Sequence, residues 1–189
     1  MAKQFPSIGN DHRAFVLRQH IFFVASAAPG THVNVSPRDL KSLRVLGPNQ
    51  VAYLDRTGSG NETAAHIRAG GRMTIMFCAF KGPPSILRLY GCGTVHHRRS
   101  REFTRILEEQ FGGEAPLGTR QIVLLAVELV QTSCGFGVPL FDYQDERKAM
   151  DRWANAKGAA GINEYWREKN VRSIDGLPTG IFEDEETAV

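Results

Sequence analysis

The sequence predicts a mainly β protein, a small antiparallel β-barrel flanked by helices. About six or seven apolar, β-rich segments follow one another along the 189 residues. Most are separated by short turns and not by crossover helices, which argues against a doubly wound parallel sheet. The length suits one domain with a sizeable core, and no repeat, low-complexity tract or linker divides it. We therefore expect one domain over residues 1–189, with a C-terminal helical extension from about 143 to 189.

The first two strands should form a hairpin. A short helix carrying Phe15, Val16 and Leu17 precedes them. Residues 21–26 are apolar, and residues 31–36 alternate between apolar and polar side chains. Pro29-Gly30 between the two segments is typical of a turn.

The remaining strands are expected at 42–46, 50–55, 72–80, 85–97 and 120–133. Gly91 and Gly93 lie at alternate positions of the fourth of these, a pattern typical of a sharp bend or of a flat object lying close. Helices are expected at 62–69, at 100–111, and in two C-terminal segments separated by Gly-Ala-Ala-Gly.

The last strand is unusual because residues 122–127, Ile-Val-Leu-Leu-Ala-Val, are apolar on both faces. Only one face of a strand in a small barrel meets the interior. The other face needs a cover, which is either the C-terminal helices or a second copy of the chain.

One junction has the character of an anion cradle. Residues 55–63 read Asp-Arg-Thr-Gly-Ser-Gly-Asn-Glu-Thr, and they join an apolar strand to a short helix. Free N–H groups ahead of a helix, with hydroxyls from Thr57, Ser59 and Thr63, can hold a phosphate. A capped helix behind a tight turn explains the same residues, and no lysine or nucleotide-binding motif is present.

Composition excludes several classes of function. A net charge of +3 is too small to indicate nucleic-acid binding. No apolar run approaches membrane-helix length, and the three cysteines form no paired motif, so we expect a cytoplasmic protein with reduced thiols. His96 and His97 alternate across a strand, so no metal site is expected. No motif identifies a catalytic residue.

Five sequence blocks occur in a characteristic order and spacing: HVNVSPRD, VAYLDRTGSGNETAAHI, RMTIMFCAF, ILRLYGCG and QTSCGFGVP. Together they resemble the pyridoxamine 5′-phosphate oxidase-like family, in particular its smaller branch with a late SIDGLP loop. The resemblance implies a six-stranded antiparallel split barrel. It also implies a homodimer, with FMN lying in a cleft between the two subunits.

The resemblance also implies site residues. Arg38 matches a basic residue that touches the FMN phosphate, with Asn34 and Ser36 on the same strand near the ring. The phosphate turn corresponds to Thr57–Asn61. Its two positive charges are absent here, so binding would depend on backbone N–H groups and nearby polar side chains. The full implied cofactor set is Asn34, Ser36, Arg38, Thr57, Ser59, Gly60, Asn61, Thr63, Arg88, Gln131 and Ser133.

Three functions remain open from the sequence. The first is an FMN-dependent oxidoreductase of an unidentified small molecule, possibly reduced by NAD(P)H. The second is a non-catalytic flavin-binding or storage protein. The third is a split barrel that uses deazaflavin or haem, for which His66 is the histidine considered as a ligand. The chain lacks the C-terminal substrate-phosphate motif of the true oxidases, so slow or absent turnover of pyridoxamine phosphate is expected.

Overall fold

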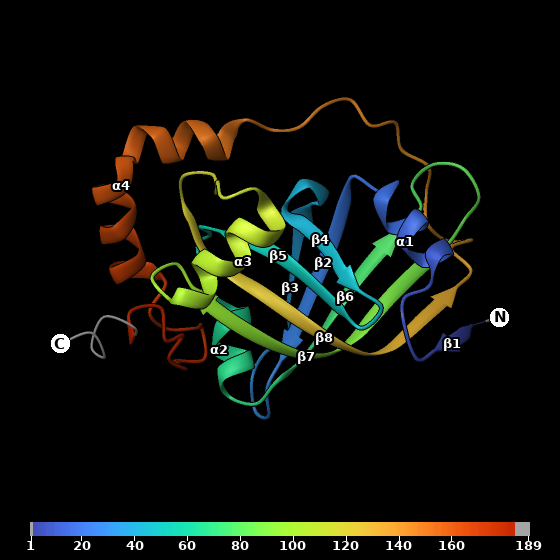
Figure 1. Ribbon diagram of the computed structural model, residues 1–189, viewed down its shortest axis with the longest axis horizontal. Helices are drawn as coiled ribbons and strands as arrows, with labels where there is room; N and C mark the ends of the chain where they lie inside the picture. Colours follow the sequence, from blue (N-terminus) through green and yellow to red (C-terminus); the bar gives the residue numbers. More distant parts are fainter. Residues whose placement is uncertain (1, 184–189) are drawn as a thin grey trace.

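The computed structural model describes residues 2–183, and its centre is one strongly curled antiparallel sheet (Figure 1). The strand order is β3-β2-β6-β7-β8-β5-β4, and β1 pairs with the far end of β8. The strands are β1 (Lys3–Phe5), β2 (Ile21–Ala27), β3 (Asn34–Asp39), β4 (Leu43–Gly47), β5 (Gln50–Arg56), β6 (Arg72–Cys78), β7 (Ile86–His97) and β8 (Thr119–Ser133). The mainly β, antiparallel barrel class is thus confirmed.

The expected count of six strands is wrong, because the described residues form an eight-stranded sheet. The seven strands expected from the residue patterns are all present as β2 to β8. The eighth, β1, comes from an N-terminal segment whose polar residues gave no strand pattern, and it pairs with Val130–Thr132 of β8. The predicted hairpin is confirmed, with Val24 of β2 opposite Ser36 of β3.

The concave side of the sheet holds the main core. Phe22 and Val24 from β2, Ile75 and Phe77 from β6, and Leu125 from β8 are fully buried there. Strand β3 ends one side of the sheet and β5–β4 ends the other, so the barrel is split between them. Helices α1 (Asn10–Leu17) and α2 (Glu62–Arg68) flank this barrel (Figure 1).

Helix α3 (Arg101–Phe111) covers the outer face of β8 within the same chain. Its Phe103 and Ile106 pack on Ile122, together with Ala52 and Leu54 of β5. Leu124 packs partly against the same cluster. The argument that this strand needs a second subunit as its cover is therefore wrong: a helix placed between β7 and β8 in sequence returns onto both strands and supplies the cover.

The two glycines of β7 serve packing within the protein. A register shift between Tyr90 and Gly91 marks a bulge, which confirms the expected bend. A Cβ on Gly91 would lie 1.8 Å from the Ala126 carbonyl oxygen, and a Cβ on Gly93 would lie 2.5 Å from Ile67 of α2. Backbone and helix approach closely at these positions, so there is no room there for a flavin ring.

The C-terminal extension leaves the barrel after β8. Residues 134–148, which we call the strap, run over the molecule without regular structure before α4 (Ala149–Lys169), as Figure 1 shows. Helix α4 is kinked at Gly158, whose φ is 64°, which confirms the expected break between two helical segments. Its Ala154, Ile162 and Trp166 form a small core with Ile181. Residues 184–189 of the predicted extension lie outside the described residues.

Candidate functional site

A polar row runs along β3 at the split of the barrel. Asn34, Ser36 and Arg38 alternate with exposed residues, so all three share the inner face of this strand. The Asn34 amide donates to Ser36 Oγ at 3.3 Å and to Thr63 Oγ1 of α2 at 3.4 Å. The row therefore connects the edge strand β3 to α2, and the structure brings these predicted residues together.

A buried charge cluster lies at the Arg38 end of that row. Asp55 is 0% exposed and forms ion pairs with Arg38 at 2.7 Å and with Arg120 at 3.0 Å. The Gln121 amide donates to the same carboxylate at 2.7 Å. Burial raises the pKa of Asp55, but the charges of Arg120 and Arg38 and the hydrogen bonds from Arg120 and Gln121 lower it by more, so it lies below its ordinary value. The single negative charge of Asp55 is therefore shared by the guanidinium groups of Arg38 and Arg120.

The side chains of the predicted cradle are already engaged inside the chain. The Thr57 hydroxyl donates to the Gly118 carbonyl at 2.7 Å and accepts from Trp166 Nε1 at 2.8 Å. The Asn61 carbonyl oxygen accepts from Gln121 at 2.8 Å. Thr57 and Asn61 are both buried, whereas Ser59 is exposed at the tip of the loop. Thr57 and Asn61 thus hold the loop, which leaves Ser59 and the backbone to face a ligand.

The backbone of this loop has a defined polarity. The Gly58 carbonyl accepts from Asn170 Nδ2 at 3.1 Å, and the Gly60 carbonyl accepts from Arg120 Nη1 at 2.7 Å. Within residues 2–183, the peptide N–H groups of Gly58 to Asn61 donate to no acceptor. Glu62, which follows the loop, has its carboxylate on the Ile174 N–H at 3.1 and 3.2 Å.

The remaining predicted residues form a second cluster on the opposite face of the sheet. Arg88 donates to Ser133 Oγ at 3.1 Å, and Tyr90 donates to Gln131 at 3.3 Å. Their strand neighbours Leu87 and Leu89 point into the core, so Arg88 and Tyr90 point outward. The structure does not bring Arg88, Gln131 and Ser133 to the β3 row of the same chain.

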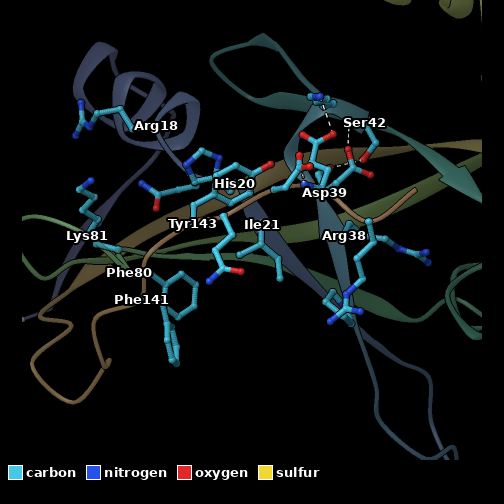
Figure 2. Close-up of a pocket in the computed structure, with 18 of the residues that line it drawn as sticks. Arg18, His20, Ile21, Arg38, Asp39, Ser42, Phe80, Lys81, Phe141 and Tyr143 are labelled. Carbon is cyan, nitrogen blue, oxygen red and sulfur yellow. Dashed lines mark hydrogen bonds and ion pairs between the residues drawn. The ribbon is translucent and has the colours of Figure 1, made fainter. Parts of the chain in front are cut away.

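A groove of about 1820 Å³ lies between the barrel and the strap, and both Arg38 and Thr57 line it. Figure 2 shows its aromatic side, where Tyr143 of the strap stacks on His20 with ring centroids 3.8 Å apart. Phe141 of the strap contacts Phe80, with ring centroids 5.5 Å apart. The strap is thus fastened along one side of a large groove that reaches the charge cluster.

Sequence reasoning missed Asp55, Arg120 and Asn170. A signal existed for the first two, since each places a charge at the end of an apolar strand pattern, where burial with a partner is expected. Asn170 gave none, because an asparagine at a helix end is ordinarily a solvent-exposed cap.

His66 does not face any groove. It belongs to α2, where it is 0% exposed on the buried side of the helix, and its Nδ1 lies 3.0 Å from Ser26 Oγ. Its burial under its own helix leaves it out of reach of an external haem. No group of three metal-ligating side chains occurs within residues 2–183.

The comparisons with known proteins agree with this architecture. The pyridoxamine 5′-phosphate oxidase family model matches residues 8–134. A relative from Aspergillus flavus, the pyridoxamine 5′-phosphate oxidase family protein ustO, is 38% identical over 190 residues, covering 92% of this chain and 76% of that protein. The chain belongs to the pyridoxamine 5′-phosphate oxidase family.

Solved structures related to this family member share the fold at low sequence identity. A Lactobacillus delbrueckii protein, provisionally assigned as a pyridoxamine 5′-phosphate oxidase, superposes with a TM-score of 0.52 at 16% identity, covering 67% of this chain and 94% of that one. A histidine-to-alanine variant of HupZ from Group A Streptococcus gives a TM-score of 0.54 at 17% identity, covering 67% of this chain and 99% of that one. Among the described residues, no helix has the length and apolar character to cross a membrane.

Proposed function

We propose that this family member binds FMN at the split of the barrel and acts as an FMN-dependent oxidoreductase of a small molecule. The observation that carries the proposal is a chain of contacts from Arg38 to a loop whose peptide N–H groups lack acceptors within residues 2–183. Arg38 and Arg120 share the Asp55 carboxylate, and Arg120 also donates to the Gly60 carbonyl of that loop. Arg38 lines the groove, and its buried Nε has no hydrogen-bond partner among residues 2–183. A phosphate needs such donors and a positive charge.

The charges near the loop fit an anion. Arg38 and Arg120 share the single charge of Asp55, which leaves a net positive cluster beneath the loop. Glu62 opposes an anion, because its carboxylate lies against Gly60, where an added Cβ would be 2.7 Å from its Oε1. That carboxylate accepts from the Ile174 N–H, which offsets part of its charge. We assign the phosphate contacts to Arg38, Ser59 and the backbone of Gly58 to Asn61. Gly60 is one of the predicted residues in that backbone.

FMN supplies the electron transfer when it is bound, and the protein supplies binding and orientation. Asn34 and Ser36 are half-buried beside Arg38, and their amide and hydroxyl offer hydrogen bonds to the flavin. Thr57, Asn61 and Thr63 act behind these residues by holding the loop and the row in place. No general acid or base is assigned.

The outward cluster enters the proposal through a homodimer. Arg88, Gln131 and Ser133 would meet the flavin of a second copy, since they cannot reach the β3 row of their own chain. Within residues 2–183, the same face of the sheet carries exposed apolar side chains, including Val35 at 60% exposure. A second copy placed on this face would bury them and complete both sites.

The test is flavin binding followed by reduction. Wild-type protein mixed with FMN should quench flavin fluorescence at about one FMN per chain, and NAD(P)H should bleach the bound flavin. Bound flavin that no reductant bleaches would support the storage function. No quenching and no spectral shift would contradict the proposal.

A further inference from the structure

Helix α4 and its C-terminal cap are in contact with the loop that we assign to the phosphate. Asn170 is 0% exposed and follows the last residue of α4. Trp166, one turn earlier, is 7% exposed and donates to Thr57 at the start of the loop. Both residues lie outside the family match, which ends at residue 134.

Asn170 uses its whole side chain and its backbone in this contact. Its Nδ2 donates to the Gly58 carbonyl, and its Oδ1 accepts from Arg120 at 2.8 Å. Its backbone carbonyl accepts from Thr179 Oγ1 at 2.6 Å and from Asn61 Nδ2 at 3.4 Å. A single buried residue therefore connects the loop, the charge cluster and the C-terminal segment.

These contacts have a consequence for the direction of the loop's peptide groups. A peptide carbonyl and the N–H of the following residue point in opposite directions across a planar unit. Asn170 and Arg120 draw the Gly58 and Gly60 carbonyls inward, so the N–H groups of Ser59 and Asn61 are turned away from the interior. Glycine at these positions would otherwise leave the loop free among many conformations.

We infer that the C-terminal helix is a working part of the cofactor site, with Asn170 and Trp166 as positioning residues that fix loop 57–61 for the FMN phosphate. This inference rests on the proposed function. The turn lacks the basic residues that would otherwise help to order it for the phosphate. In this inference α4, which lies beyond the family match, orders the loop instead. Arg38, whose buried Nε lacks a partner in residues 2–183, is the independent sign of an anion site, and it is connected to this loop through Asp55 and Arg120.

The experiment compares Asn170→Ala and Trp166→Phe with matched changes on the same helix. Asn155 is exposed, and Trp153 makes no hydrogen bond through its ring N–H within the described chain, so Asn155→Ala and Trp153→Phe are the controls. The Kd values of FMN and riboflavin are measured for each variant at a temperature where circular dichroism shows it folded. A merely structural role would weaken both ligands alike.

We expect the preference for FMN over riboflavin to fall at least about fivefold in Asn170→Ala and Trp166→Phe and to stay unchanged in the controls. Hydrogen exchange of the ligand-free protein should also show faster exchange at residues 57–61 in these two variants only. If wild-type protein prefers FMN and both variants keep that preference, the inference is overturned. If wild-type protein binds no FMN, the proposed function fails instead, and the exchange rates still decide whether α4 orders the loop.

Discussion

The two polar clusters of this protein differ in how completely one chain satisfies them. At the barrel split, Asp55, Arg120 and Asn170 are buried, and each has partners from other elements. On the outer face, Arg88 and Ser133 are half-buried and hydrogen-bonded to each other, and this face carries apolar residues that are exposed within residues 2–183. The C-terminal helix of the same chain supplies the remaining hydrogen-bond partners of the first cluster. We propose that a second copy of the chain covers the second cluster. Substitutions at the split should therefore change the free energy of unfolding and the affinity for FMN, whereas substitutions on the outer face should change dimer formation.

The largest effect is expected from Asp55→Ala. This change leaves Arg38 and Arg120 without their shared counter-charge, and Arg120 is only 2% exposed. Losing one partner of a buried ion pair costs about 3–5 kcal/mol. Urea unfolding should show this loss, while the exposed Asp142→Ala should change the free energy of unfolding by less than about 0.5 kcal/mol. Equal, small losses for both variants would show that the cluster contributes little.

The same carboxylate should make stability depend on pH in the acidic range. The pKa of Asp55 lies below its ordinary value in the folded protein, so its contribution is fully present above the unfolded pKa of about 3.9. The contribution is lost as the pH falls through the lower, folded pKa. The free energy of unfolding should therefore fall less steeply with acid in Asp55→Asn than in wild type. Parallel curves for the two proteins would contradict this assignment.

Arg38→Ala tests the phosphate end of the split. A lost charge-assisted hydrogen bond costs about 1.5–3 kcal/mol, so FMN affinity should fall roughly ten- to a hundredfold. Riboflavin, which lacks the phosphate, should lose much less. Ser59→Ala should show the same selectivity with a smaller loss, and Arg18→Ala, at an exposed arginine of the same groove, should leave both affinities unchanged. Equal losses for the two flavins would refute a phosphate role for Arg38.

Val35→Glu tests the outer face. Val35 is 60% exposed, so the change should leave the monomer folded while it places two like charges in the proposed interface. The dimer dissociation constant should rise by more than about tenfold. Leu17→Glu, at a residue 61% exposed on α1, is the control. Sedimentation velocity distinguishes them, and an unchanged oligomeric state in Val35→Glu would place any dimer interface elsewhere.

The smallest effect is expected from Ser133→Ala, which removes the acceptor of the Arg88 hydrogen bond. The donor is the charged Arg88 guanidinium, but the acceptor is a neutral hydroxyl and both residues are only half-buried, so we expect this bond to contribute about 0.5–1.5 kcal/mol. FMN and riboflavin affinities should fall together by roughly two- to tenfold, because this residue lies away from the phosphate. A loss confined to FMN would show that the outer cluster also meets a phosphate.

The sequence predicted most of the fold because local patterns determine it. Alternation and turn residues located the β2–β3 hairpin, and glycines marked the bend at Gly91 and the kink at Gly158. The cover of Ile122 by Phe103 could not be predicted in that way, since it depends on where a helix returns in space. Only part of the site could be predicted, because prediction depended on local patterns. Arg38 and residues 57–61 have such a pattern, but Arg120 and Asn170, which bind this loop, lie 60 or more residues away in the sequence.

The most direct test of a flavin site built from two copies is complementation between two damaged chains. One chain carries Arg38→Ala, the other carries Arg88→Ala with Ser133→Ala, and the heterodimer is purified by two different tags. One of its two sites then has all its residues intact, so it should bind FMN with wild-type affinity at about half the wild-type stoichiometry. Each parental homodimer should bind weakly at both sites. A heterodimer that binds no better than its parents would contradict the shared site.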